Sequence, residues 1–122
     1  MAWALNKDKP IYAQLVEVIG NRIISGEYGA GEKVPSVREL AAEAAVNPNT
    51  MQKAFAELER KGMIITARTS GRAVTEDKEL LKNLRFQMAR DQINEFFDNM
   101  KKMGFEQDEV ICLMKNVVEG EQ

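Results

Sequence analysis

Three polar residues at neighbouring positions, Asn49, Gln52 and Lys53, have side chains suited to contact with nucleic-acid bases. Asn and Gln amides pair with the edge of adenine, whereas a Lys ammonium suits guanine or a phosphate. A helix over these residues would place them on the side opposite an apolar stripe that includes Met51 and Phe55. The pattern predicts a helix that buries one side and presents the other to a polynucleotide.

Two helix starts lie a short turn apart in this region. Ser36 and Glu39 form an S-x-x-E capping box, so a helix is expected to begin at Val37. Asn47 is a good N-cap, and Pro48 suits the first helical position, where its missing N–H is not needed. A short helix, a tight turn and a second helix predict a helix-turn-helix, whose second helix enters a DNA major groove with its N-terminal residues.

The remaining residues predict one earlier helix, a β-hairpin and a helical C-terminal part. The expected elements are a helix over about 11–25, a short strand over 32–34, the second helix of the motif ending at Gly62, strand-like runs at 63–67 and 72–75, and helices over about 77–104 and 108–119. The fold class is therefore mainly α with a small β wing. We expect a winged helix-turn-helix DNA-binding domain over 1–75 and a C-terminal two-helix dimerisation arm over 76–122.

An apolar stripe runs along the expected helix of the arm, with steps of three or four residues. Its members are Phe86, Ala89, Ile93, Phe96, Met100 and Met103. Such spacing is typical of a packing interface with another helix, although the stripe could also line a ligand pocket. One thin hairpin cannot cover this surface, so the stripe predicts the interface of a homodimer.

The motif residues resemble the winged helix-turn-helix of GntR-family bacterial transcription regulators. The short remainder is similar to the family's small YtrA-like branch, which lacks a large effector domain. The segments that carry the resemblance are 10–12, Gly26, 31–35, 35–41, 47–50 and 56–62.

The resemblance implies DNA contacts by several further residues. It implies that Arg38 contacts DNA, the alternative being a solvated surface arginine. Thr50 and Ser36 suit phosphate at helix N-termini. Ser36 and Asn47 are expected as caps, with an added DNA role open. Family members often carry arginine at the positions of Pro48 and Gln52, so base preference does not transfer.

The hairpin tip is the expected wing of this fold. Its candidate DNA contacts are Arg68, Ser70, Gly71 and Arg72, and the two arginines suit a phosphate or a narrow minor groove. The family often has a glycine-x-glycine tip, which this chain replaces with Thr-Ser-Gly. A plain solvated hairpin is the alternative.

Composition excludes several classes of protein. The net charge is −2, but residues 1–75 hold 10 Lys/Arg against 8 Asp/Glu, while residues 76–122 hold 7 against 11. With no histidine and one cysteine, the usual general base and the common metal ligands are scarce, so no enzyme, metal or cofactor is expected. Cys112, between two apolar residues, is expected to be a buried thiol. No stretch suits a signal peptide or a membrane span, which favours the cytoplasm.

Together these features predict a cytoplasmic, homodimeric, sequence-specific transcription regulator that binds a pseudo-palindromic operator in double-stranded DNA. Repression is implied by the resemblance alone. Two alternatives stay open: a winged-helix protein-interaction module without specific DNA binding, and a small enzyme whose active site the sequence does not display. The sequence identifies no small-molecule effector; two helices enclose little volume, so an effector is expected at the dimer interface or between arm and winged domain.

Overall fold

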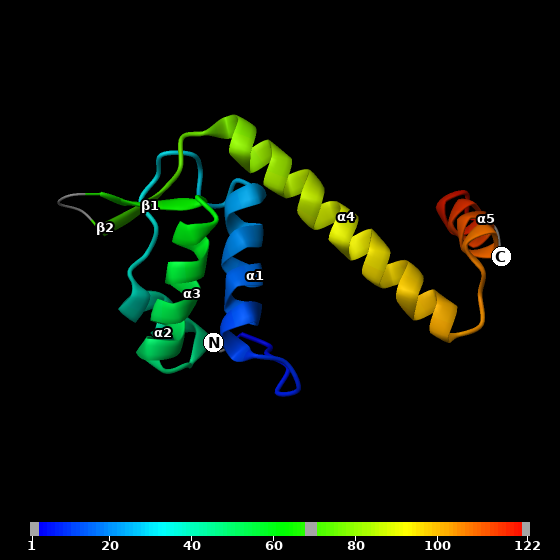
Figure 1. The fold of residues 1–122 in the computed structure, drawn as a ribbon, viewed down its shortest axis with the longest axis horizontal. Coiled ribbons are helices and arrows are strands. Elements are labelled where there is room, and N and C mark those ends of the chain that lie inside the picture. Colours follow the sequence, from blue (N-terminus) through cyan, green and yellow to red (C-terminus); the bar gives the residue numbers. More distant parts are fainter. Residues whose placement is uncertain (1–2, 68–70, 121–122) are drawn as a thin grey trace. The chain divides into compact units, whose positions relative to one another are not determined.

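The computed structural model describes residues 3–67 and 71–120, and it divides into two compact units, 1–84 and 85–122. The first unit holds α1 (Ile11–Ile24), α2 (Val37–Ala44), α3 (Pro48–Arg60), β1 (Ile64–Ala67) and β2 (Gly71–Val74). The second holds most of α4 (Lys78–Lys102) and all of α5 (Gln107–Val118). Figure 1 shows the order of these elements along the chain. The mainly helical fold with a small β wing is confirmed.

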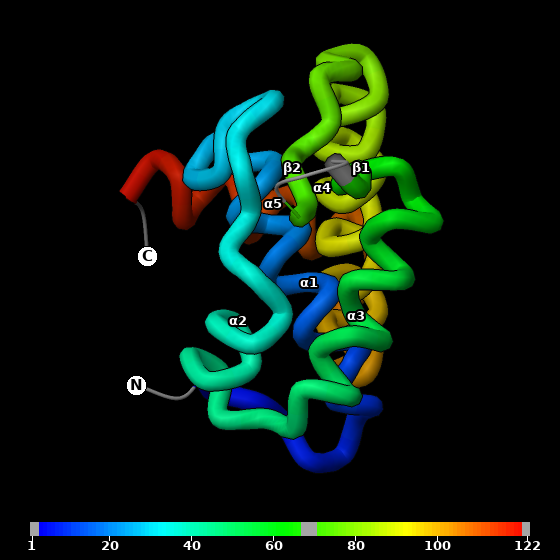
Figure 2. Tube along the Cα trace, turned by 90° about the vertical axis from the view of Figure 1, so that its left-hand side faces the viewer, coloured from blue at the N-terminus to red at the C-terminus, as the bar shows by residue number. Residues whose placement is uncertain are grey.

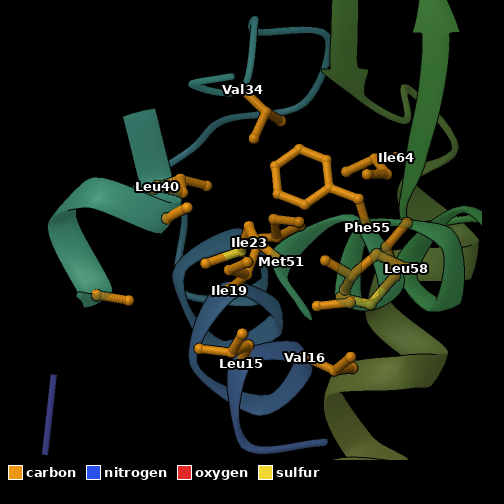
Figure 3. Close-up of a cluster of buried hydrophobic side chains, with 14 of the residues drawn as sticks. Leu15, Val16, Ile19, Ile23, Val34, Leu40, Met51, Phe55, Leu58 and Ile64 are labelled. Atoms are coloured by element: carbon orange, nitrogen blue, oxygen red, sulfur yellow. The ribbon is translucent and has the colours of Figure 1, made fainter. Parts of the chain in front are cut away.

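Helix α3 is the centre of the first unit. It contacts α1, α2 and β1, and Figure 2 shows α1 and α3 beside each other. Met51, Ala54, Phe55 and Leu58 of α3 are fully buried. The Phe55 ring lies between Val34 and Ile64 (Figure 3), so the helix is held by the segment before α2 and by the first strand of the hairpin.

The two helix starts form as the sequence predicts. The Ser36 hydroxyl accepts a hydrogen bond from the Glu39 backbone N–H at 3.0 Å, and the Glu39 carboxylate accepts one from the Ser36 N–H at 3.2 Å. The Asn47 side chain accepts a hydrogen bond from the Asn49 N–H at 2.7 Å, and Pro48 is the first helical residue. Both caps satisfy backbone donors that a helix start leaves free. Between the helices Ala45 adopts φ = 60°, a left-handed conformation that is uncommon outside glycine.

The predicted hairpin is confirmed, but the short strand predicted over 32–34 does not form. Strands β1 and β2 pair antiparallel, from Ile64 opposite Val74 to Ala67 opposite Gly71. The strand expected over 32–34 is only a single bridge between Lys33 and Ala73. Backbone hydrogen bonds still attach this segment to β2, with Val34 N–H donating to the Arg72 carbonyl at 2.9 Å. The approach is too short to count as a strand, but it buries Val34 against Phe55.

The boundary between the compact units falls inside α4, later than the expected domain limit at 75/76. Leu81 and Leu84 of the first turns pack against the winged core, and Leu80 lies against Gly62. Gly62 has φ = 80°, and a Cβ there would lie 3.1 Å from Leu80 Cδ2. The packing of these turns assigns them to the first unit. The functional division at 75/76 stays a prediction.

The second unit leaves much of its apolar surface exposed. Figure 1 shows α5 nearly end-on while α4 lies across the view, so the two helices of the expected thin hairpin are inclined to each other and do not lie side by side along their length. Val110 is the buried residue of α5. The expectation of a buried Cys112 is wrong: its thiol is exposed, since a helix that touches α4 near one end cannot cover its neighbours. None of the described helices is long and apolar enough to cross a membrane.

The capping box predicts a measurable stability of α2. Ser36→Ala should lower the free energy of unfolding by about 1 kcal/mol, because it leaves an N-terminal N–H without its partner. Urea denaturation followed by circular dichroism measures this. Glu39→Gln is the matched control, because glutamine can keep the reciprocal hydrogen bond. An unchanged unfolding midpoint in Ser36→Ala would contradict a stabilising cap.

Candidate nucleic-acid interface

The exposed side of α3 is flanked by two hollows. One hollow, of about 650 Å³, separates α3 from the start of α2 and the wing. Five predicted site residues line it: Ser36, Arg38, Gln52, Gly71 and Arg72. The other, of about 610 Å³, lies between the first turns of α3 and α1 and is lined by the predicted residues Asn49, Thr50 and Lys53. Thus the predicted residues gather on both flanks of one helix.

Asn47 lies in neither hollow. Its side chain caps α3, and the cap role is confirmed. A DNA role for Asn47 and for Ser36 stays a prediction. Arg68 and Ser70 at the wing tip lie outside the described residues. Their predicted DNA contacts therefore stay predictions as well.

The cations of this face differ in how they are held. Arg38 is exposed at the second position of α2, and among the described residues no hydrogen bond or ion pair restrains it. Its guanidinium is therefore available to a phosphate or a base edge. This arrangement suits the predicted contact with DNA, because no partner among the described residues competes for the Arg38 side chain.

Arg72 is held inside the winged unit. Its Nε donates to Glu59 Oε1 at 2.5 Å, and its guanidinium lies 5.1 Å from the centroid of the Phe55 ring. The Thr66 hydroxyl donates to the other Glu59 oxygen at 3.1 Å. One carboxylate of α3 thus binds residues from both strands of the wing. A phosphate that approached Arg72 would have to share it with Glu59.

Sequence reasoning missed Glu59 and Tyr12 as members of this surface. Glu59 lies in the second helix of the motif and Tyr12 in a segment of family resemblance, and the sequence indicated no role for either. Both contacts join residues from different elements: Glu59 meets Arg72 of β2, and Lys53 Nζ lies 4.1 Å from the Tyr12 ring centroid. The spacing of residues along one helix does not indicate which residues of another element they contact. A search for carboxylates facing wing arginines could have proposed the first.

The wing contact makes stability depend on pH. The hydrogen bond from Arg72 lowers the pKa of Glu59 below its ordinary value of 4.5. Because the folded pKa is depressed, the pair stabilises the fold above the unfolded pKa and is lost as pH falls through the folded pKa. Glu59→Gln should therefore cost about 1 kcal/mol or less at pH 7. Its difference from the wild type should shrink below about pH 4.5.

Denaturant unfolding at a series of pH values measures this difference. Glu17→Gln, which neutralises an exposed carboxylate of α1, is the control and should follow the wild type throughout. A Glu59→Gln difference that stays constant from pH 7 to pH 3 would show that the carboxylate charge does not hold the wing.

The comparisons with known proteins agree with this geometry. The sequence profile "Bacterial regulatory proteins, gntR family" matches residues 11–74. The regulator YhcF of Bacillus subtilis (strain 168) is 37% identical over 112 residues, covering 92% of this chain and 93% of YhcF. The transcriptional repressor YtrA of the same strain is 35% identical over 109 residues, covering 88% of this chain and 84% of YtrA.

Solved structures give the same result. A GntR-family regulator from Listeria monocytogenes superposes with a TM-score of 0.82 at 40% identity, covering 92% of this chain and 98% of that one. The DNA-binding domain of AraR, solved in complex with operator ORX1, superposes with a TM-score of 0.53 at 28% identity, covering 62% of this chain and 92% of that one. The resemblance drawn from the sequence is confirmed, and the relatives are regulators, not enzymes. This chain belongs to the GntR family of bacterial regulatory proteins and is a DNA-binding transcription regulator with a winged helix-turn-helix.

Proposed function

We propose that this regulator binds a pseudo-palindromic operator as a homodimer in the cytoplasm and represses transcription by blocking access to a promoter. The observation that carries the proposal is the exposed side of α3. The hollow along one edge of this helix is lined by Gln52 and by Arg38 of α2, and the hollow along the other edge is lined by Asn49 and Lys53. Two copies would place two such helices in successive major grooves. The AraR DNA-binding domain with its operator supports this mode of binding, and the repressor YtrA supports the sign of regulation.

The dimer is supported by apolar side chains that the single chain leaves in water. Phe86 is 52% exposed, Ile93 53% and Phe96 42%, all on α4, and Met103 beyond its end is 69% exposed. Ala89 is also exposed and Met100 is partly buried, so every member of the predicted stripe reaches the surface. Exposed apolar side chains in this number mark interaction sites. A second copy presents the same stripe, which a two-fold axis can bring together.

The effector stays unidentified. Within the second unit, a hollow of about 290 Å³ between α4 and α5 is lined by Phe97, Phe105 and Val110 together with polar side chains. Its volume lies at the lower limit of small-molecule sites, so it gives no evidence for a metabolite. The expectation that an effector binds at the dimer interface or between arm and winged domain stays a prediction.

The experiment that tests the proposal is selection of binding sites from random DNA with the full-length protein. We expect enriched sites with two related half-sites about one helical turn apart, as a symmetric dimer requires. Enrichment of single half-sites would contradict dimeric binding. No enrichment at all would contradict sequence-specific recognition.

The stripe gives a prediction about assembly. Phe96→Asp should place an unpaired charge in the interface at a cost of several kcal/mol. The wild type should sediment as a dimer at tens of micromolar, whereas the variant should sediment as a monomer and lose most operator affinity. Asn94→Asp, which adds a charge two residues away on another side of α4, is the control and should stay dimeric. Monomeric wild type would contradict the dimer.

A second prediction separates two kinds of DNA contact. Gln52, on the exposed side of α3, should contact a base edge, so Gln52→Ala should relax preference at one or two operator positions by about 1–3 kcal/mol. Arg38, at the rim, should hold the DNA backbone. Arg38→Ala should weaken all sequences alike and reduce the salt slope of binding by about one unit.

Titrations of operator, single-mismatch operators and random DNA at several salt concentrations measure both effects. Lys61→Ala, at the far end of α3, is the control for simple loss of positive charge. Equal loss of base preference in the Gln52 and Arg38 variants would contradict this division.

A further inference from the structure

The hollow between α1 and α3 contains one contact that the family resemblance did not assign. Its lining comes from the start of α1, with Pro10, Ile11 and Tyr12, and from the start of α3, with Asn49, Thr50 and Lys53. Figure 1 shows that the first turns of α1 and α3 lie at the same end of the winged unit. Across this hollow, the Lys53 ammonium lies 4.1 Å from the centroid of the Tyr12 ring.

The contact restrains a side chain that otherwise moves freely. The face of an aromatic ring attracts an ammonium group placed within about 6 Å of its centroid. Tyr12 is partly buried and packs against the winged core, so its ring has a fixed position. Lys53 is exposed and has a flexible four-carbon stem. The ring therefore selects one direction for a lysine that would sample many.

That direction leads away from Gln52. Consecutive residues of a helix point about 100° apart. Gln52 lines the hollow toward α2 and the wing, whereas Lys53 lines the hollow toward α1. When a helix lies in a major groove, base edges face its inner side and phosphates flank it on both sides. The Tyr12 ring thus holds Lys53 at the edge of α3 that faces α1, away from the side chain expected to reach a base, and a point charge at that edge suits a phosphate.

We propose that Tyr12 is a positioning residue that holds the Lys53 ammonium toward a phosphate of one DNA strand. Lys53 then supplies affinity without base preference, which resolves the choice between guanine and phosphate that its residue type leaves open. The inference rests on the proposed binding of α3 in a major groove. Asn49 and Thr50 complete the polar lining of the same flank.

A double-mutant cycle on the full-length protein tests the proposal. Its corners are the wild type, Tyr12→Leu, Lys53→Met and the double variant, with Tyr12→Phe as the matched control that keeps the ring. Affinities for the selected operator and for random DNA are measured over a range of salt concentrations. NMR of the Lys53 ε-methylene in the free protein reports the ring directly, through an upfield shift that should be present in Tyr12→Phe and absent in Tyr12→Leu.

Lys53→Met should weaken operator and random DNA alike and reduce the salt slope by about one unit. Tyr12→Leu should weaken both DNAs about two- to fivefold, the range of an exposed cation–π pair, and should have no further effect when Lys53 is already Met. Tyr12→Phe should bind like the wild type. Denaturation curves establish that each variant is folded at the assay temperature, since Tyr12 also packs against the core.

Three results would overturn the proposal while DNA binding itself stands. They are a Tyr12→Leu loss that persists undiminished in the Lys53→Met background, an equal loss in Tyr12→Phe, and altered base preference in Lys53→Met. An equal loss in Tyr12→Phe would assign the effect to the hydroxyl group. A wild type with no salt-dependent DNA affinity would overturn the proposed function together with this inference.

Discussion

Burial of the inner side of α3 is the constraint on which the rest of the winged unit depends. Four side chains of this helix, Met51, Ala54, Phe55 and Leu58, have no exposed surface. They are surrounded by α1, α2 and the start of the hairpin, and the Phe55 ring fills the space between Val34 and Ile64 (Figure 3). Close-packed interiors leave a helix little freedom to rotate or slide. Because one side is held this firmly, the opposite side must face solvent, and a rigid helix with one polar side suits insertion into a groove of fixed width.

The same packing organises the charges around α3. Glu59 at its end binds Arg72 and Thr66, and so connects the helix to both strands of the wing. Lys53 nearer its start lies over Tyr12 of α1. Arg38, on the short helix α2, is the cation of this set that the described structure leaves exposed and unrestrained. Ordering side chains before binding reduces the entropy that must be lost on the DNA, which compensates in part for a small number of cations.

The C-terminal unit shows the opposite condition, with a large apolar surface and little to cover it. Helices α4 and α5 cross, so the stripe from Phe86 to Met103 and the apolar side chains of α5 are exposed in the single chain. A helix pair of this size cannot form its own core. The homodimer that we propose would remove this apolar surface from water. The exposure of Cys112 has the same cause. Its apolar neighbours in the sequence suggested burial, but the described part of the unit has no interior large enough to contain the side chain.

The sequence by itself determined the features that arise from local chemistry. The capping box of Ser36 and Glu39, the cap at Asn47 with Pro48 after it, and the buried stripe of α3 follow from residue type and helical spacing, which operate within a few residues. Only the tertiary structure decided which charges meet across elements, where the compact units divide, and how α5 meets α4. Those outcomes depend on how packed elements face one another, as in Glu59 with Arg72 and Lys53 with Tyr12. Periodicity along one helix indicates which side is polar. The partner residue on that side comes from a distant part of the chain, and the packing of the whole core sets its position.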